Sequence, residues 1–100
     1  MTDSPLRFRR ARADDLPDIV AMLADDELGA KREDPSIPLN PRYTAAFAAI
    51  EQDPNQFFAV VERDARLVGC LQLSFIPGLS RLGQWRGQIE SCLLYTSRCV

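Results

Sequence analysis

The hydrophobic pattern of this chain changes its period at one turn signal, Asp53-Pro54-Asn55. Before this point, apolar residues recur three and four positions apart, the spacing that places them on one face of a helix. After it, residues 57–62, 67–76 and 85–95 alternate or are continuously apolar, as strands are. Since 100 residues form one domain rather than two, this change of period predicts a single α+β domain.

A strand and a helix are expected at the start of the chain. Residues 6–11 alternate apolar and basic residues, which predicts a half-buried strand with Leu6 and Phe8 on one face. The helix is expected to start at Asp14 or Asp15, because aspartate is a preferred residue at helix N-termini. Its apolar stripe consists of Leu16, Ile19, Val20 and Leu23.

A second helix is expected after residues 25–40, a stretch with two prolines and no clear period that we interpret as a loop. Asn40 is its predicted N-cap, and Pro41 suits the first helical position. Three strands then form an antiparallel meander, joined by a turn at residues 63–66 and a loop at residues 79–83. The predicted order is β-α-α-β-β-β, with two helices packed on the sheet and the last strand left as an open edge.

Composition excludes several functional classes. Lys and Arg number 12 against 14 Asp and Glu, so the net charge is −2, which argues against sequence-independent binding of nucleic acid. No apolar run reaches the roughly 18 residues needed to cross a membrane. The chain has no histidine, which excludes a Ser-His-Asp triad and a histidine-ligated metal, and we expect no metal site.

The cysteines indicate a reducing compartment. They are three in number and form no Cys-x-x-Cys pair, so we predict reduced thiols in a cytoplasmic protein, with Cys70 and Cys92 as strand side chains. The aromatic residues are predicted as core; they include Tyr43, Phe57, Phe58, Phe75 and Trp85. A solvated basic strand face is predicted from Arg7, Arg9, Arg10 and Arg12.

Glu90 is the side chain that most suggests chemistry, because it interrupts a strand-like segment and glutamate is depleted in strands. A carboxylate in a partly enclosed site can act as a general base. The alternative is a surface position. In that case Gln88 and Glu90 alternate out to solvent, while Ile89, Ser91 and Leu93 point inward.

Acidic residues also collect between the two predicted helices. They are Asp25, Asp26, Glu27, Glu33 and Asp34. Acids at the C-terminus of a helix oppose its dipole, and a cationic ligand would offset that repulsion. The alternative is a solvated loop that Lys31 and Arg32 partly neutralise.

Three stretches, taken in order, resemble the GNAT superfamily of acetyl-CoA-dependent N-acetyltransferases. Residues 6–19 are similar to the first strand and helix of that family, residues 57–73 to its central hairpin, and residues 85–91 to its fourth strand. The resemblance implies transfer of an acetyl group from acetyl-CoA to the amine of a small molecule or peptide. It also implies an α+β fold of which this chain supplies the N-terminal half.

The resemblance assigns roles to particular residues. Glu90 matches the strand-four glutamate that serves some members as the base for the amine. Leu93 and Leu94 occupy positions whose backbone groups contact acetyl-CoA, where an N–H group would stabilise developing negative charge. The acceptor-binding residues implied by the acidic segment are Asp26, Glu27 and Glu33.

One departure from the family concerns the end of the chain. The family's glycine-rich loop, which binds the pyrophosphate of coenzyme A at a helix N-terminus, has no counterpart in residues 92–100. We therefore expect residues 1–91 to be the front part of a GNAT-like domain, and residues 92–100 to be an atypical end. Such a truncated chain is expected to be inactive. The alternative is a non-catalytic interaction module that uses its open sheet edge, with a homodimer as one form.

Overall fold

The computed structural model describes residues 5–25 and 27–94, and the structural statements below refer to these residues. The elements before the predicted change of period are β1 (Arg7–Arg10), the short 3-10 helix η1 (Ala13–Asp15), α1 (Leu16–Leu23), α2 (Glu27–Arg32) and α3 (Pro41–Gln52). Those after it are β2 (Gln56–Arg63), β3 (Arg66–Pro77), α4 (Ser80–Gly83) and β4 (Trp85–Leu94).

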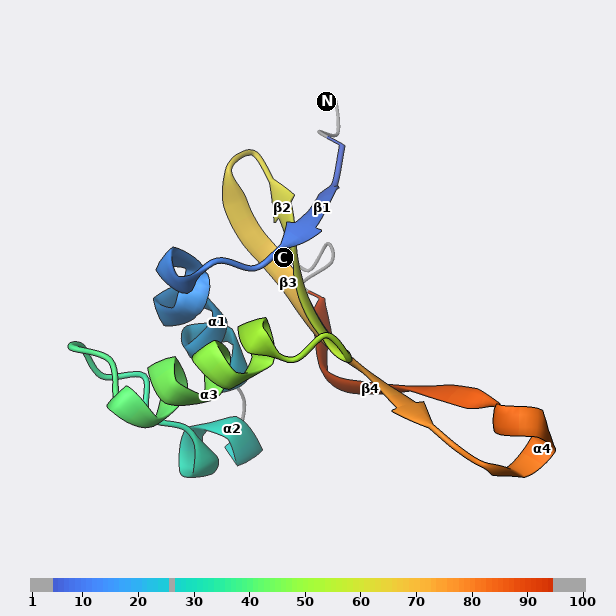
Figure 1. Ribbon diagram of the computed structural model, residues 1–100. Helices are drawn as coiled ribbons and strands as arrows, with labels where there is room; N and C mark the ends of the chain where they lie inside the picture. The colour runs from blue at the N-terminus through green and yellow to red at the C-terminus, as the bar shows by residue number, and fades with distance from the viewer. Residues whose placement is uncertain (1–4, 26, 95–100) are drawn as a thin grey trace.

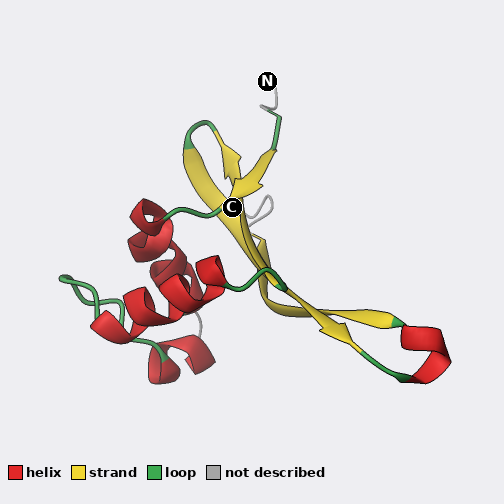
Figure 2. Cartoon of the chain, viewed as in Figure 1, coloured by secondary structure: helices red, strands yellow, loops and turns green. Residues whose placement is uncertain are grey.

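The four strands form one antiparallel sheet in the order β1-β2-β3-β4. The helices α1, α2 and α3 lie on one side of this sheet, while the outer parts of β3 and β4 extend away as a long arm that ends in α4 (Figure 1). Figure 2 shows the same separation of helices and strands. The predicted α+β class and the meander of β2, β3 and β4 are confirmed, and β4 is the outer strand of the sheet among the described residues.

The core lies between the sheet and the two longer helices, α1 and α3. Its buried members are Ala11, Leu16, Ile19, Met22, Phe47, Phe58, Val60 and Cys70. The predicted stripe of α1 is confirmed, although Leu23 at its end is only partly buried. Helical spacing brings these apolar side chains to one face, and their burial against the sheet holds the helices in place.

The predicted helix starts are also confirmed. Asn40 caps α3 with its side-chain oxygen, which accepts a hydrogen bond from the Arg42 backbone N–H at 2.9 Å. Asp15 is the N-cap residue of α1, and Pro17 lies in the first turn, where its missing N–H costs nothing. α3 has 12 residues, and no helix in the described part of the chain is long and apolar enough to cross a membrane.

The prediction of a continuous loop at residues 25–40 is wrong, because α2 forms within it. This helix has six residues and no apolar stripe, and its one large apolar side chain, Leu28, is exposed. Its residues are mostly good helix formers, and Lys31 and Arg32 in the last turn complement the helix dipole. A helix of this length leaves too little periodic signal to detect.

The first strand exposes the residue that was expected to be half-buried. Phe8 is 72% exposed, because it pairs with Val61 and so lies on the face of the sheet opposite the core residue Val60. Arg9, the next residue, points to the helix side instead. The alternation of residues in β1 is therefore as predicted, but the assignment of its buried face is wrong.

The two connections within the meander take left-handed backbone conformations. Asp64 and Ala65, in the predicted turn, have φ values of 55° and 62°, the combination typical of a tight hairpin. At residues 79–83, predicted as a loop, the structure has the single turn α4. Its central residues Arg81 and Leu82 have φ values of 56° and 61°, so α4 does not continue as a regular helix.

Two predicted core aromatics, Phe75 and Trp85, are exposed. The register of β3 and β4 explains this, since Pro77 pairs with Trp85 and Phe75 with Gly87 in the arm beyond the helices. Phe58 is buried in the core as expected, whereas Phe57 and Tyr43 are partly buried. The alternation of residues along a strand does not predict which part of the strand the helices will cover.

Candidate active site

A β-bulge interrupts β4 directly after Glu90. Glu90 pairs with Gln72 and Leu93 pairs with Cys70, so two residues of β4, Ser91 and Cys92, stand opposite one residue of β3. Ser91 has a φ of 51°, a left-handed conformation that is uncommon for serine. A bulge of this kind breaks the regular pairing and redirects the backbone groups of the strand.

The buried thiol of Cys70 holds this bulge from the neighbouring strand. Cys70 Sγ donates a hydrogen bond to the Ser91 carbonyl oxygen at 3.4 Å. Burial raises the pKa of Cys70 to about 11, although a hydrogen bond from the Leu93 backbone opposes the shift. The thiol is therefore protonated at neutral pH and acts as a donor rather than a nucleophile. Cys70 lies in β3 and Cys92 in β4, so both are strand residues, as predicted.

A largely apolar groove of about 150 Å³ lies between α1, α3 and the sheet, and Ser91 of the bulge reaches into its lining. The helices contribute Ile19, Leu23, Tyr43 and Ile50, among others, and Gln72 contributes from β3. The groove is partly open to solvent. It is a candidate binding site that combines an apolar wall with a few polar groups.

Glu90 stands at the edge of this groove. It pairs with Gln72 and precedes Ser91, both of which line the groove. Its carboxylate is exposed and accepts a hydrogen bond from Gln88 Nε2 at 2.7 Å. Glu90 therefore lies on the helix side of the sheet, and the described residues do not enclose it. Ile89, which the surface alternative expected to point inward, is 62% exposed on the opposite face, so that part of the alternative is wrong.

A row of polar side chains continues from Glu90 across the same face. Gln56 Oε1 accepts hydrogen bonds from Gln72 Nε2 at 3.0 Å and from Ser74 Oγ at 2.9 Å. Ser74 pairs with Gln88, which contacts Glu90. The helix side of the sheet thus changes from an apolar core to a polar surface at the bulge.

The predicted acceptor residues are only partly visible. Asp26 lies outside the described residues, and Glu27 begins α2 with a side chain that is not described. Glu33 Oε1 accepts a hydrogen bond from the Tyr43 hydroxyl at 2.7 Å, and that hydroxyl accepts one from the Asp34 backbone N–H at 2.8 Å. Tyr43 also lines the groove, so its ring connects the acidic segment to the candidate site.

Tyr43 was predicted only as a core aromatic. Partial burial, with help from Glu33, raises the pKa of its phenol, so the hydroxyl stays protonated at neutral pH. Gln72 and Ser91 were likewise not predicted as groove residues. Tyr43 could have been singled out because helical spacing places it on the apolar stripe of α3, while its hydroxyl requires a polar partner.

Asp34 organises the segment that follows α2. Its carboxylate accepts hydrogen bonds from the Ser36 backbone N–H at 3.2 Å, from the Ser36 hydroxyl and from Asn40 Nδ2 at 3.3 Å. These contacts, led by the Ser36 side chain, hold the pKa of Asp34 below its usual range. Because Asn40 caps α3, Asp34 connects the acidic segment to the start of that helix.

The two predicted contacts for acetyl-CoA lie just beyond the bulge. Leu93 pairs with Cys70, and its side chain packs against the core. The Leu94 backbone pairs with Gly69, and its side chain is not described. Both residues have returned to regular pairing with β3, and the irregular backbone of β4 lies just before them, at Ser91 and Cys92.

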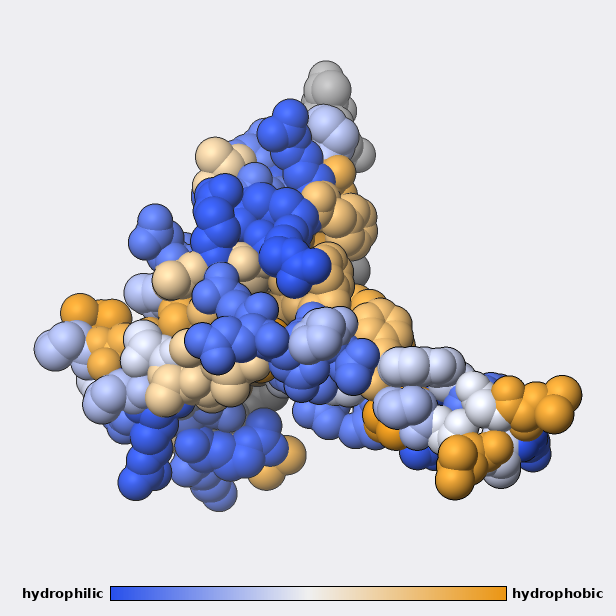
Figure 3. All heavy atoms as spheres, viewed as in Figure 1, coloured by the Kyte–Doolittle hydropathy of each residue, from blue (hydrophilic) through white to orange (hydrophobic). Residues whose placement is uncertain are grey.

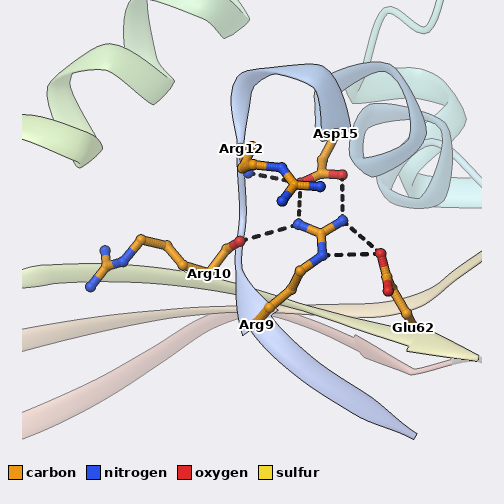
Figure 4. Close-up of polar contacts among 5 residues, drawn as sticks. All are labelled: Arg9, Arg10, Arg12, Asp15 and Glu62. Carbon is orange, nitrogen blue, oxygen red and sulfur yellow. Dashed lines mark hydrogen bonds and ion pairs between the residues drawn. The ribbon is translucent and has the colours of Figure 1, made fainter. Parts of the chain in front are cut away.

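An ion-pair cluster fixes the first helix relative to the sheet. The guanidinium of Arg9 binds both carboxylate oxygens of Asp15 at 2.8 Å each, and its Nε and one terminal nitrogen reach Glu62 Oε2 at 3.0 and 2.8 Å (Figure 4). Asp15 also accepts a hydrogen bond from the Arg12 backbone N–H at 2.7 Å. Three elements, β1, the start of α1 and β2, therefore meet at one arginine.

This cluster corrects the prediction of a solvated basic face, since Arg9 is only partly exposed. The hydrogen bonds from Arg9 hold the pKa of Asp15 below its usual range, and the two carboxylates raise that of Arg9. Arg10, on the other face, stacks over the Phe57 ring at 4.5 Å. The cluster positions α1, one wall of the groove, and its own residues Arg9, Asp15 and Glu62 are not among those that line the groove.

Solved structures of similar shape cover nearly the whole chain. A transcriptional regulator from Bacillus halodurans C-125 shares 39% identity over 93% of this chain and 62% of its own, with a TM-score of 0.86. An acetyltransferase from Trypanosoma brucei shares 23% identity over 93% of this chain and 62% of its own, with a TM-score of 0.66. A predicted acetyltransferase from Clostridium acetobutylicum, solved with acetyl-CoA, shares 15% identity over 94% of this chain and 62% of its own, with a TM-score of 0.64.

The chain therefore spans about three fifths of the length of these similar structures. No protein-family model and no curated protein matches it.

Proposed function

We propose that this chain forms the acceptor side of an N-acetyltransferase. Its described residues have the acetyltransferase fold of the GNAT superfamily. The acyl donor is acetyl-CoA and the acceptor is an amine. The observation that carries this proposal is the bulge of β4 at Ser91, which borders the groove between α1 and α3 with Glu90 immediately before it.

The reaction divides the work among a few residues. An ammonium loses a proton to the Glu90 carboxylate, and the lone pair of the resulting amine attacks the thioester carbon. The C–N bond forms, the C–S bond breaks, and the thiolate that leaves takes up one of the two protons on the attacking nitrogen, which keeps the other as the amide N–H. Backbone N–H groups near Leu93 and Leu94 would stabilise the negative charge that develops on the carbonyl oxygen.

The acidic segment supplies charge for a cationic acceptor. Glu33 accepts a hydrogen bond from Tyr43, which lines the groove, and Asp26 and Glu27 precede Glu33 along the chain. Carboxylates at this position attract an alkylammonium before it is deprotonated. A small polyamine and a peptide amine both carry an alkylammonium group of this kind.

We further propose that the chain binds acetyl-CoA very weakly, since it resembles the family only as far as the fourth strand and the glycine-rich loop for the pyrophosphate is missing from residues 92–100. The described residues would contact only the pantetheine end of the donor. Without a site for the pyrophosphate, the residues given are expected to be inactive in acetyl transfer. Cytoplasmic placement, inferred from the reduced thiols, belongs to the same proposal.

Backbone NMR of the chain during titration with acetyl-CoA and with S-acetyl-pantetheine tests this proposal. Both ligands are expected to shift the amides of Ser91, Cys92 and Leu93 with the same affinity, near or above about 1 mM, because the nucleotide would have no site. Saturation by acetyl-CoA at micromolar concentration would show that the chain does bind the nucleotide part of coenzyme A, and would contradict the proposal. If neither ligand shifts the amides of β4, the proposed donor site at the bulge is wrong.

The acceptor is tested separately. Spermidine is expected to shift groove residues such as Tyr43 in the wild-type chain, and Glu33→Gln is expected to weaken this response several-fold, because it removes one of the attracting charges. Thr44→Val, next to Tyr43 on α3 but outside the groove lining, is the control and should respond as wild type. An unchanged response in Glu33→Gln would contradict the assignment of the acidic segment.

A second candidate is a non-catalytic interaction module. β4 is the outer strand of the sheet in the described chain, and its unpaired edge could accept a strand from another protein. The name of the Bacillus halodurans relative points to a regulator, whereas the negative net charge of this chain still argues against nucleic acid as the partner. Shifts at Ser91–Leu93 on adding acetyl donor favour the acetyltransferase over this module.

A further inference from the structure

Gln72 is a half-buried side chain of β3 that lines the groove between α1 and α3. It pairs directly with Glu90 of β4, so the two side chains stand next to each other on the helix side of the sheet. Glu90 offers a carboxylate there. The amide of Gln72 offers both a donor and an acceptor, and its hydrogen bonds to neighbouring residues decide which of the two remains for a ligand.

Those hydrogen bonds hold the Gln72 amide in one orientation. Its Nε2 donates to Gln56 Oε1 at 3.0 Å, and Ser74 Oγ donates to the same oxygen at 2.9 Å. Gln56 belongs to β2 and pairs with Ser74, so both donors come from β3 and meet one carbonyl oxygen of the neighbouring strand. The nitrogen end of the Gln72 amide is therefore used toward β2, and its carbonyl oxygen is the end that remains.

This carbonyl oxygen is open to a ligand. Among the residues that the structure describes, none donates a hydrogen bond to Gln72 Oε1, and none donates one to Glu90 Oε1. Every fully buried polar side-chain atom of the described residues has a partner, so the oxygen of the half-buried Gln72 is accessible. Two hydrogen-bond acceptors, one of them charged, thus stand side by side at the polar end of the groove.

A pair of acceptors of this kind matches an ammonium group. An alkylammonium has several N–H bonds, of which only one has to be broken before the nitrogen attacks. The carboxylate of Glu90 is basic enough to take that proton. The neutral carbonyl of Gln72 accepts a hydrogen bond from a second N–H without competing for its proton, and so holds the nitrogen in place.

The remainder of the groove suits the carbon chain of such an amine. The lining from α1 and α3 is mostly apolar and includes Ile19, Leu23 and Ile50. Figure 3 shows hydrophobic residues between hydrophilic ones in the region of these two helices. Methylene groups next to the ammonium gain free energy when they leave water for such a wall. The polar end with Gln72 and the apolar wall therefore act on different parts of one molecule.

We propose that Gln72 is an acceptor-binding residue, whose carbonyl oxygen holds one N–H of the substrate ammonium while Glu90 takes the proton of another. Gln56 is the positioning residue that keeps the amide in the orientation this requires. The inference rests on the proposed acetyltransferase function and adds a residue to its acceptor site. It predicts a preference for ammonium groups that keep their N–H bonds over those in which carbon replaces every hydrogen.

NMR titration of the chain with butylammonium and with butyltrimethylammonium tests this inference. The two probes have the same charge and the same butyl chain, but only butylammonium donates hydrogen bonds. We expect the wild-type chain to bind butylammonium at least about threefold more tightly. Gln72→Met keeps an unbranched side chain and leaves Gln56 bonded to Ser74. This variant should bind butylammonium at least about threefold more weakly than wild type, and butyltrimethylammonium equally well.

Ser74→Ala is the matched control, because it removes the other hydrogen bond to Gln56 Oε1 and lies outside the groove lining. It should bind both probes as the wild type does. An equal loss for both probes in Gln72→Met, or the same loss in Ser74→Ala, would mean a general disturbance of the groove and would overturn the role of Gln72. The comparison of the two probes in the wild type needs no variant, and equal affinities there would overturn it too.

The same titrations separate this inference from the proposed function. If Gln72→Met binds butylammonium as tightly as wild type, the role of Gln72 is wrong, while the groove stays the acceptor site of the proposed acetyltransferase. If butylammonium shifts no groove residue of the wild-type chain, the acceptor site itself is wrong, and the role of Gln72 with it.

Discussion

The thiol of Cys70 and the carbonyl of Ser91, 21 positions apart in the sequence, meet at the bulge of β4 with a separation of 3.4 Å. Ser91 needs such a partner because its left-handed backbone turns the strand away from regular pairing. The same bulge borders the groove between α1 and α3. A buried cysteine of the adjacent strand therefore supports the irregular backbone on which the proposed function depends.

Removal of this thiol is expected to destabilise the chain. Cys70→Ala leaves the Ser91 carbonyl without its donor and opens a small cavity, at a combined cost of about 1–3 kcal/mol in the free energy of unfolding. Urea denaturation measures the loss. Cys92→Ala, at the exposed cysteine of the bulge, is the control and should change stability by less than about 0.5 kcal/mol. Equal effects of the two variants would contradict a special role for Cys70.

The pH dependence of stability provides an independent test of Cys70. Its pKa is raised from 9.0 to about 11 in the folded chain, so above pH 9 the unfolded chain releases the proton first. The resulting stabilisation, roughly 2 kcal/mol, is present below pH 9 and is lost as the pH rises to about 11. Cys70→Ser keeps a donor but does not titrate there. Its free energy of unfolding should therefore fall less between pH 8.5 and 11 than that of the wild type.

The Arg9 cluster should be sensitive both to mutation and to acid. Arg9→Met leaves Asp15 and Glu62 without their partner, and we expect a loss of about 2 kcal/mol in the free energy of unfolding. The pKa of Asp15 is lowered in the folded chain, so its stabilisation is present above the unfolded value of 3.8 and is lost as the pH falls below it. Asp15→Asn should remove this acid dependence. Arg7→Met, in the same strand, should leave both stability and acid dependence nearly unchanged.

Ala65 is a site where a single substitution should stabilise the chain. Its φ of 62° is unfavourable for alanine and free of strain for glycine. Ala65→Gly is expected to raise the free energy of unfolding by about 0.5–1 kcal/mol, measured by thermal or urea denaturation. Ala59→Gly, in the middle of β2, should have the opposite sign, because extended strand interiors disfavour glycine. A loss of stability in Ala65→Gly would mean that the hairpin turn is different in solution.

Tyr43 should control the order of the segment after α2. Tyr43→Phe keeps the ring in the groove but removes the hydroxyl that bridges Glu33 and the Asp34 N–H. Amide exchange at Asp34 is therefore expected to accelerate at least several-fold, with a stability loss of about 1 kcal/mol. Thr44→Val also removes one hydroxyl hydrogen bond, to the Pro41 carbonyl, but should leave exchange at Asp34 unchanged.

The elements that the sequence predicts well depend on residues only a few positions apart. The apolar stripe of α1 and the Asn40–Pro41 start of α3 are confirmed, because helical spacing and capping are local properties. The strands of the meander are confirmed within one or two residues for the same reason. α2 was missed because one and a half turns with an exposed leucine produce no periodic signal.

The candidate site was predicted less completely than the fold. Glu90 could be singled out as an acid within a strand, and the structure places it beside the groove. The bulge at Ser91 could not be predicted, because it is a mismatch in length between two strands that becomes visible only in their pairing. The role of Glu90, Leu93, Leu94, Asp26, Glu27 and Glu33 in acetyl transfer stays a prediction.

The amino-acid sequence by itself determined the class of this chain, the positions of its main helices and strands, and its resemblance to the acetyltransferases, because these follow from spacing and local residue preference. Only the tertiary structure decided which face of each strand is buried. Arg9 is drawn to the helix side by Asp15 and by Glu62, 53 positions away, while Phe8 is left exposed. Alternation gives a strand two faces, but the elements that pack against it determine which one becomes the core.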